Sequence, residues 1–230
     1  MPDGSPWWPS GPQAAQQIEI GHRFMLAQRF ERAIECFRAA IGFEPENADA
    51  HGRLAIALLG AERYEDADRV AAAAQQQWPE VAPLLQVRSS TLCALGKWQE
   101  ATALLQHALA LLPNCHVSYV SLGRILFQQE QYVEAETALR QALHMEPEDW
   151  QTLLLFAATL AAQNNWQEAH RAFESVLQQA PHESAVHAEA ALYFLQTGNL
   201  ERATPHVHEA LRIEPQNELA HHCLTLLGPA

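Results

Sequence analysis

The chain has 230 residues, of which 48% are hydrophobic and 18% are charged, and its 14 basic and 27 acidic residues give a formal net charge of −13. Hydrophobic content at this level argues against a wholly disordered chain, and no apolar run reaches the roughly 18–20 residues that a membrane-spanning helix needs. Because a polyanion would be repelled by this charge, the sequence predicts no general binding of nucleic acid.

The first 13 residues contain four prolines, two glycines and the adjacent Trp7 and Trp8. This composition predicts a flexible arm, and without a basic start or an apolar stretch it does not resemble a secretory signal. Two exposed indoles beside prolines would leave much apolar area in water, so a docking segment is the second interpretation. The four cysteines form no Cys-x-x-Cys pair, which favours free thiols in a reducing cytoplasm.

Six prolines are spaced by 34 residues without insertion or deletion: Pro45, Pro79, Pro113, Pro147, Pro181 and Pro215. Twelve residues before each proline stands an alanine: Ala33, Ala67, Ala101, Ala135, Ala169 and Ala203. Twenty-four residues before it the side chain is always small: Gly21, Ala55, Ser89, Gly123, Ala157 and Ala191. Fifteen residues before it five of six are aromatic: Phe30, Tyr64, Trp98, Tyr132, Trp166 and Leu200. Self-similarity at a fixed period indicates a repeat architecture.

Each unit splits into two stretches with helical apolar periodicity, for example 117–129 and 133–145. Small residues favour close helix crossings, and each proline ends its unit because the residue before it is pushed out of the helical region. Polar residues follow that can cap the next helix, namely Asn47, Asp149, Ser184 and Asn217. Two departures stand out, since Arg88 replaces an apolar residue in the third unit and Pro205 predicts a bend in the sixth.

These residues and their spacing resemble the tetratricopeptide repeat, a 34-residue helix–turn–helix unit. The resemblance covers residues 14–217 as six repeats, 14–47, 48–81, 82–115, 116–149, 150–183 and 184–217. It implies an all-α, right-handed α-solenoid (a superhelix) whose concave groove is lined by the first helix of each pair. Residues 218–230 continue the phase of a first helix and are expected to form a C-terminal capping helix and tail.

The geometry of the family also implies which side chains line the groove, and these are Ile18, His22, Met25, Ile56, Leu59, Val120, Arg124, Phe127, Leu154, Ala158, Leu192 and Leu195. From Val120 to Leu195 the strip is mostly apolar, with Arg124 as an isolated cation. A soluble monomer seldom exposes such a strip, so we expect it to bind an apolar segment, although tighter coiling that buries these residues is the alternative. The clamp with which some members of the family grip acidic chaperone tails is missing, because the matching places hold residues such as Ile56, Gln86 and Ser90.

No pattern of catalytic residues or phosphate-binding loop is visible, so the sequence predicts neither an enzyme nor a bound cofactor. His206 and His208, like His221 and His222, would not face the same way on a helix, which favours solvated surface over a metal site. Nine of the twelve histidines follow residue 115, and they raise the hypothesis of pH-dependent association.

The sequence thus favours a cytoplasmic adaptor, not an enzyme, whose groove holds a peptide or helix of a partner protein, without nucleic-acid binding or membrane insertion. The first alternative is a self-assembling scaffold, a homo-oligomer in which the N-terminal arm docks in the groove of a neighbouring copy. The second is a chaperone that escorts secreted proteins, which some bacterial members of the family resemble.

Overall fold

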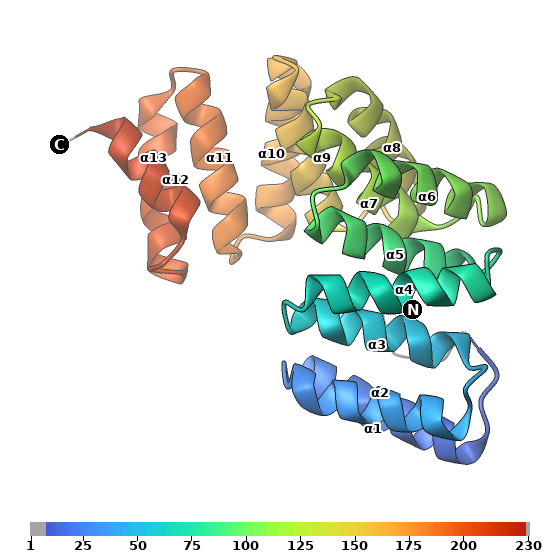
Figure 1. Ribbon diagram of the computed structural model, residues 1–230. Coiled ribbons are helices and arrows are strands. Elements are labelled where there is room, and N and C mark those ends of the chain that lie inside the picture. The colour runs from blue at the N-terminus through green and yellow to red at the C-terminus, as the bar shows by residue number, and fades with distance from the viewer. Residues whose placement is uncertain (1–7, 229–230) are drawn as a thin grey trace. The chain divides into compact units, whose positions relative to one another are not determined.

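The computed structural model describes residues 8–228, so Trp7 of the predicted arm lies outside the described residues. All regular secondary structure in this part of the chain is α-helical (Figure 1), and the helices are α1 (Pro12–Leu26), α2 (Phe30–Phe43), α3 (Ala48–Gly60), α4 (Tyr64–Gln77), α5 (Ala82–Ala94), α6 (Trp98–Leu111), α7 (His116–Gln128), α8 (Tyr132–Met145), α9 (Trp150–Ala162), α10 (Trp166–Gln179), α11 (Ser184–Gln196), α12 (Leu200–Ile213) and α13 (Glu218–Leu227). The predicted all-α, helix–turn–helix architecture is confirmed. None of these helices combines the length and the apolar character that crossing a membrane requires.

The first helices of the pairs, from α3 to α13, begin 34 residues apart. The second helices, from α2 to α12, also begin 34 residues apart. The second helices begin at the position that is aromatic in five repeats. Helix α1 is the exception, because it begins at Pro12, two residues before the predicted start of the first repeat. Proline is well suited to the first turn of a helix, where its missing N–H has no intrahelical partner in any case.

Every turn within a helix pair contains one residue with a left-handed backbone, and these residues, again 34 apart, are Gln28, Glu62, Gly96, Glu130, Asn164 and Gly198, with φ between 55° and 73°. Hydrogen bonds such as Arg63 N to the Leu58 carbonyl (2.9 Å) close the turn around this residue. Glycine adopts this conformation without strain and asparagine with little. The glutamine and glutamate positions therefore carry a local cost that the packed pair on either side overcomes.

The small residue near the middle of each first helix is buried in every repeat, as close crossing requires. In α7, a Cβ added at Gly123 would lie 2.6 Å from Leu139 Cγ of α8. In α1, a Cβ at Gly21 would lie 2.6 Å from the ring of Phe37 in α2. Even a methyl group at either glycine would therefore push the two helices apart.

Three of the four predicted caps are confirmed. Asn47 and Asn217 each accept a hydrogen bond from the backbone N–H three residues on, at 2.9 Å, and Asp149 accepts one from Gln151 N at 3.1 Å. The prediction for Ser184 is wrong, since its hydroxyl donates instead to the Ala210 carbonyl of α12 at 3.1 Å. It thereby ties α11 to the second helix of the same repeat.

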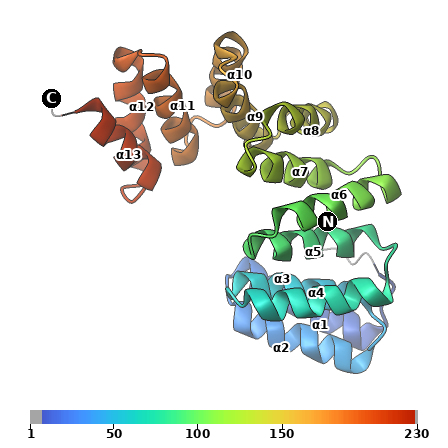
Figure 2. The ribbon, with the colours of Figure 1, turned by 45° about the horizontal axis from the view of Figure 1, so that its top comes forward.

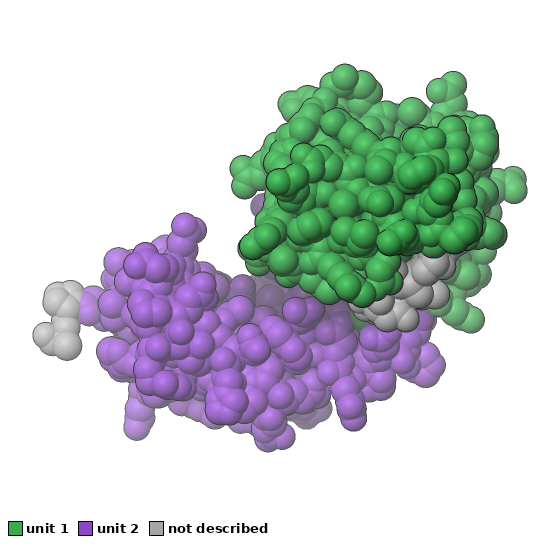
Figure 3. Space-filling view, turned by 90° about the horizontal axis from the view of Figure 1, so that it is seen from below, with its two compact units in different colours: residues 1–118 green, residues 119–230 purple. Residues whose placement is uncertain are grey.

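The chain contains two compact units, residues 1–118 and 119–230, shown in green and purple in Figure 3. In the first unit, successive helices from α1 to α6 pack on one another as antiparallel neighbours (Figure 2). Arg88 does not shorten α5, which runs for 13 residues. Its guanidinium donates to the Gln75 side chain and lies 3.9 Å from Asp68 Oδ1, so α4 supplies polar partners for the cation.

The first unit also buries an ion pair on α3. Arg53 Nε donates to Asp49 Oδ1 at 2.8 Å, and the two side chains are 11% and 0% exposed. Burial raises the pKa of Asp49, and the nearby Arg53 guanidinium lowers it in part. Arg53 is therefore the main positive group that stabilises the charged form of this carboxylate.

The core of the second unit gathers aromatic and aliphatic side chains from α8 to α12, with Phe173 of α10 at its centre. The ring of Phe173 is 1% exposed and stacks on Tyr193 of α11, with ring centroids 4.8 Å apart. Helix α12 continues through Pro205, so the predicted bend stays a prediction. Helix α13 packs on α11 and α12 and leaves Leu224 and Leu226 exposed.

Candidate functional site

Five of the predicted groove residues lie in the first unit, and they differ in how far they are exposed. Ile18 is only 2% exposed, packed against neighbouring helices, so it is a core residue and not the groove residue that was predicted. Met25 and Leu59 pack partly against the core around Phe37, and His22 is also partly buried. Ile56 is 42% exposed and is the one apolar member of this group that solvent reaches freely.

The other seven lie in the second unit, where the structure brings three of them together. Phe127, Ala158 and Leu192, from the first helices of three successive repeats, line one pocket of about 230 Å³. Leu154 and Leu195 pack against the hydrophobic core instead. Val120 is partly buried and Arg124 is exposed, and neither lines the pocket.

The pocket exists because α9 presents only small side chains at its centre. Ala158, Ala161 and Ala162 form that side of the wall. At the places equivalent to Ala158 and Ala161, α7 carries Arg124 and Phe127, and α11 carries Leu192 and Leu195. Methyl groups between two helices with longer side chains leave a space that the core does not fill.

The opposite wall belongs to α11, where Glu189, Leu192, Tyr193 and Gln196 follow one another at helical spacing and face the pocket. Glu189 is the functional residue that sequence analysis missed. Its repeat position holds Glu19, Arg53, Val87, Ser121 and Leu155 in the other units. Because charged and polar residues stand in the same phase elsewhere, the repeat pattern gives no signal that marks Glu189.

The environment of Glu189 disfavours its charge. Burial raises the pKa of its carboxyl, and no charged neighbour offsets that shift. No hydrogen bond or ion pair joins this side chain to any other among residues 8–228. The Glu189 side chain is partly exposed, so an ionised carboxylate there is compensated by solvent and not by a charged group of the protein.

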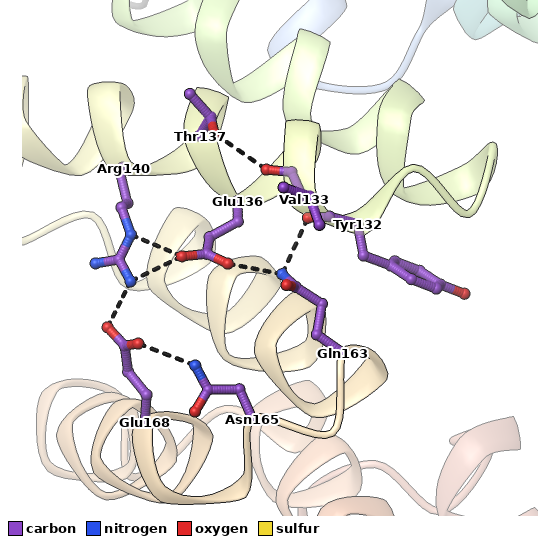
Figure 4. A network of polar contacts seen from close by, with 8 residues as sticks. All are labelled: Tyr132, Val133, Glu136, Thr137, Arg140, Gln163, Asn165 and Glu168. Carbon is purple, nitrogen blue, oxygen red and sulfur yellow. Dashed lines mark hydrogen bonds and ion pairs between the residues drawn. The ribbon is translucent and has the colours of Figure 1, made fainter.

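Hydrogen bonds hold the aromatic rim of the pocket in place. Tyr132 packs edge-on against Phe127, with ring centroids 5.5 Å apart, and its carbonyl accepts from Gln163 Nε2 at 3.1 Å. The same amide donates to Glu136 at 2.8 Å (Figure 4). On α11, the Tyr193 hydroxyl donates to the Trp166 carbonyl at 3.1 Å. The Tyr193 side chain is therefore anchored through its hydroxyl, whereas Tyr132 is bonded through its backbone and its ring is placed by the contact with Phe127.

Arg140 extends this network across two repeats. Its guanidinium lies 2.8 Å from Glu136 of its own helix and 2.6 Å from Glu168 of α10, as Figure 4 shows. It also stands over the ring of Phe156, 4.9 Å from the centroid. These contacts tie α8 to α9 and α10, each of which contributes at least one residue to the lining of the pocket.

The part of the N-terminal segment that the structure describes contacts its own unit. Trp8 lies against Trp78, with ring centroids 6.0 Å apart, and Trp78 in turn lies 5.4 Å from the ring of His51. Trp8 also packs on the small core formed by Ala48, Ala74 and Leu84. Its indole is thus partly covered without a second copy of the chain.

The late histidines differ among themselves. His208, His221 and His222 are exposed, but His206 is not the solvated residue that was predicted. Its ring stacks on Phe194 at 5.5 Å, and its Nδ1 lies 3.0 Å from His187 Nδ1. His187 Nε2 donates to the Pro181 carbonyl, which can only accept, so in a neutral His187 ring the Nδ1 atom accepts a hydrogen bond from the N–H at His206 Nδ1.

This pair predicts a pH dependence of stability. Burial lowers the pKa of His206, and His187 and Arg202 lower it further. The folded state therefore binds fewer protons than the unfolded one, and stability is lost as the pH falls below the ordinary histidine pKa of about 6.5. We expect urea midpoints of the wild type to fall more steeply between about pH 7 and pH 5 than those of His206→Phe. His208→Phe, on the exposed face of the same helix, should behave as the wild type; parallel curves for all three proteins would contradict this role.

Within the described part of the chain no group of three or more His, Cys, Asp or Glu side chains is placed to hold a metal ion. Among the described residues, no disulfide joins any of the four cysteines.

A sequence profile described as Tetratricopeptide repeat matches residues 24–87, 92–155, 126–192 and 160–227, which together cover more than half of the chain. The chain belongs to the tetratricopeptide repeat (TPR) family. TPR proteins generally act as protein–protein interaction scaffolds that bind protein partners, and they are typically non-catalytic.

Individual relatives are distant from this TPR chain. The BBSome complex member BBS4 of Bos taurus is 20% identical over 202 residues, which are 88% of this chain and 39% of that protein. The curated relatives that match are longer proteins, of which the aligned part makes up 14–39%.

Two solved structures show the same TPR fold. PilW, a type IV pilus biogenesis factor, has a TM-score of 0.84 at 18% identity, covering 94% of this chain and all of that one (100%). YrrB, described as a TPR protein with an unusual peptide-binding site, has a TM-score of 0.63 at 23% identity, covering 84% of this chain and 99% of that one.

Proposed function

We propose that this protein is an adaptor, not an enzyme, and that it takes an apolar side chain of a partner protein into the pocket between α7, α9 and α11. The observation that carries the proposal is the space over Ala158 and Ala161, walled by Phe127 and Leu192. Three of the residues expected to bind a partner meet there. A reducing, cytoplasmic setting, in which the four cysteines would stay thiols, is part of this proposal.

The size of the pocket favours one side chain over a whole small molecule. Its 230 Å³ is smaller than the roughly 300–1,000 Å³ of pockets that enclose such ligands. Burying a single Leu, Ile, Phe or Met side chain contributes about 1.5–3 kcal/mol. The segment on either side of that side chain would then lie along neighbouring first helices, as an extended peptide or a helix can.

Self-assembly through the N-terminal arm is the weaker candidate. Trp8 would have to leave its contacts with Trp78 and with the core beneath it before it could enter a neighbouring copy. No feature of the described residues favours an escort function for secreted proteins over a stable adaptor.

The pocket can be tested by filling it. We expect peptides selected from a random displayed library on the wild-type protein to lose about 1–3 kcal/mol of binding free energy in Leu192→Ala, and to bind Ala158→Phe still more weakly. Isothermal titration calorimetry measures both changes.

Ala185→Phe is the matched control, because Ala185 is exposed on α11 and the same side chain is added away from the pocket. Selected peptides should bind this variant as they bind the wild type. Equal affinity for the wild type and Ala158→Phe would exclude the pocket as the binding site.

A further inference from the structure

We propose that the pocket on α9 and α11 recognises a basic segment, in which a lysine or arginine side chain accompanies the apolar one and pairs with Glu189. The proposal rests on the proposed function and adds the chemical class of the partner. The kind of segment that fits is amphipathic and cationic, with one large apolar side chain beside one positive charge.

The first observation is where Glu189 stands. It lies one turn before Leu192 and Tyr193 on the pocket face of α11, opposite the alanine wall of α9. The other groups lining this space are alanine, leucine and aromatic side chains and one neutral amide, Gln196. None of these groups carries a positive charge, so a cation on the ligand would be the first to pair with the Glu189 carboxylate at this pocket.

The second observation is that Arg202 of α12 and Arg140 of α8 are engaged with other carboxylates. Arg202 lies 3.3 Å from Glu174 and stands over the ring of Phe194 at 4.7 Å. Arg140 is held between Glu136 and Glu168. Satisfying Glu189 with either guanidinium would break contacts that hold the helices of the unit together.

The third observation is charge complementarity over a longer range. The whole chain carries a net charge of −13, which attracts a basic segment and speeds its encounter with the protein. When the segment is bound, its cation lies next to the Glu189 carboxylate, which the pocket has already partly desolvated. A charge-assisted hydrogen bond in such a site is stronger than one on the open surface.

Two small probes of equal length separate the apolar and the ionic parts of this recognition. The full chain is titrated with n-hexylammonium and with n-hexanol, while the methyl signals of Ala158, Ala161 and Ala162 are followed by NMR. We expect the wild type to bind the ammonium about tenfold more tightly than the alcohol, as one charge-assisted hydrogen bond implies. In Glu189→Gln, which keeps the shape of the side chain, this preference should disappear.

Two control variants make the outcomes distinct. Glu201→Gln removes an exposed carboxylate from α12 and should leave the preference for the ammonium intact. Ala158→Phe should abolish the binding of both probes. Hexanol binding without any preference for the ammonium, or a preference that persists in Glu189→Gln, overturns the role of Glu189 and leaves the pocket standing. Binding of neither probe, or unchanged binding to Ala158→Phe, overturns the pocket itself.

Discussion

Phe173→Ala is expected to lower the free energy of unfolding of the second unit by about 3–5 kcal/mol. The ring is 1% exposed and lies where α9, α10 and α11 meet, stacked on Tyr193. Its removal costs the buried apolar area and leaves a cavity that the three helices cannot close without moving apart. Urea denaturation followed by far-UV circular dichroism measures the loss, and hydrogen exchange shows whether it is confined to α9–α11.

Phe43→Ala is the matched control for this large effect. Phe43 ends α2 with 52% of its surface exposed, so the same substitution should change stability by less than about 0.5 kcal/mol. Similar losses in both variants would mean that Phe173 does not hold the core together. Because Phe173 also lines the pocket, its removal should weaken peptide binding as well.

Arg53→Met is expected to destabilise the first unit by about 3–5 kcal/mol at neutral pH, as the loss of one partner from a buried ion pair usually does. Methionine replaces much of the apolar stem of Arg53 but leaves Asp49, which is fully buried, without its cation. Chemical denaturation at neutral pH measures the deficit.

The pH dependence of this deficit identifies its cause. Burial raises the pKa of Asp49, and Arg53 counteracts part of that rise. In the variant the counteracting charge is gone, so the folded state takes up a proton at a higher pH than in the wild type. When the pKa of an acid is higher in the folded than in the unfolded state, the free energy of unfolding falls as the pH rises. The loss of stability caused by Arg53→Met should therefore become smaller when the pH is lowered to about 5.

A matched pair on the surface provides the control. Arg23 and Glu19 have the same spacing along a helix and a similar separation of 2.7 Å, but their side chains are 74% and 64% exposed. Arg23→Met should therefore cost less than about 1 kcal/mol at either pH. A loss in Arg53→Met that is equally small would show that Asp49 is neutral in the folded wild type.

The helices were predictable because their determinants lie within one repeat. Proline ends each unit and a small residue allows each crossing, so the 34-residue spacing carries directly into the helix boundaries. Ser184 was predicted incorrectly because a serine at a helix start can cap its own backbone or bond a neighbouring helix. The carbonyl of Ala210, which lies 26 residues further along the chain, decides between them.

The pocket was predictable only in part, because a void depends on the combined volume of side chains from five helices, α7 to α11. Projection onto the family's geometry found Phe127, Ala158 and Leu192 but treated Ala158 as one contact among many. Glu189 lies between two positions of α11 that the family's geometry places in the groove. It is therefore not among the residues that this geometry predicts to bind a partner. Ile18 shows the opposite error, since neighbouring helices bury a position that the pattern places at the groove.

The alanines at 158 and 161 also bear on how such proteins diverge. The scaffold residues and the residues that leave the pocket empty occupy different places in the repeat, so either set can change while the other is kept. Large side chains at 158 and 161 would fill the present pocket. Small side chains at the two equivalent positions of the next repeat would open a new one, so the binding position would shift by one repeat along the same backbone. Related chains with unchanged scaffold residues can thus differ in partner through a handful of substitutions.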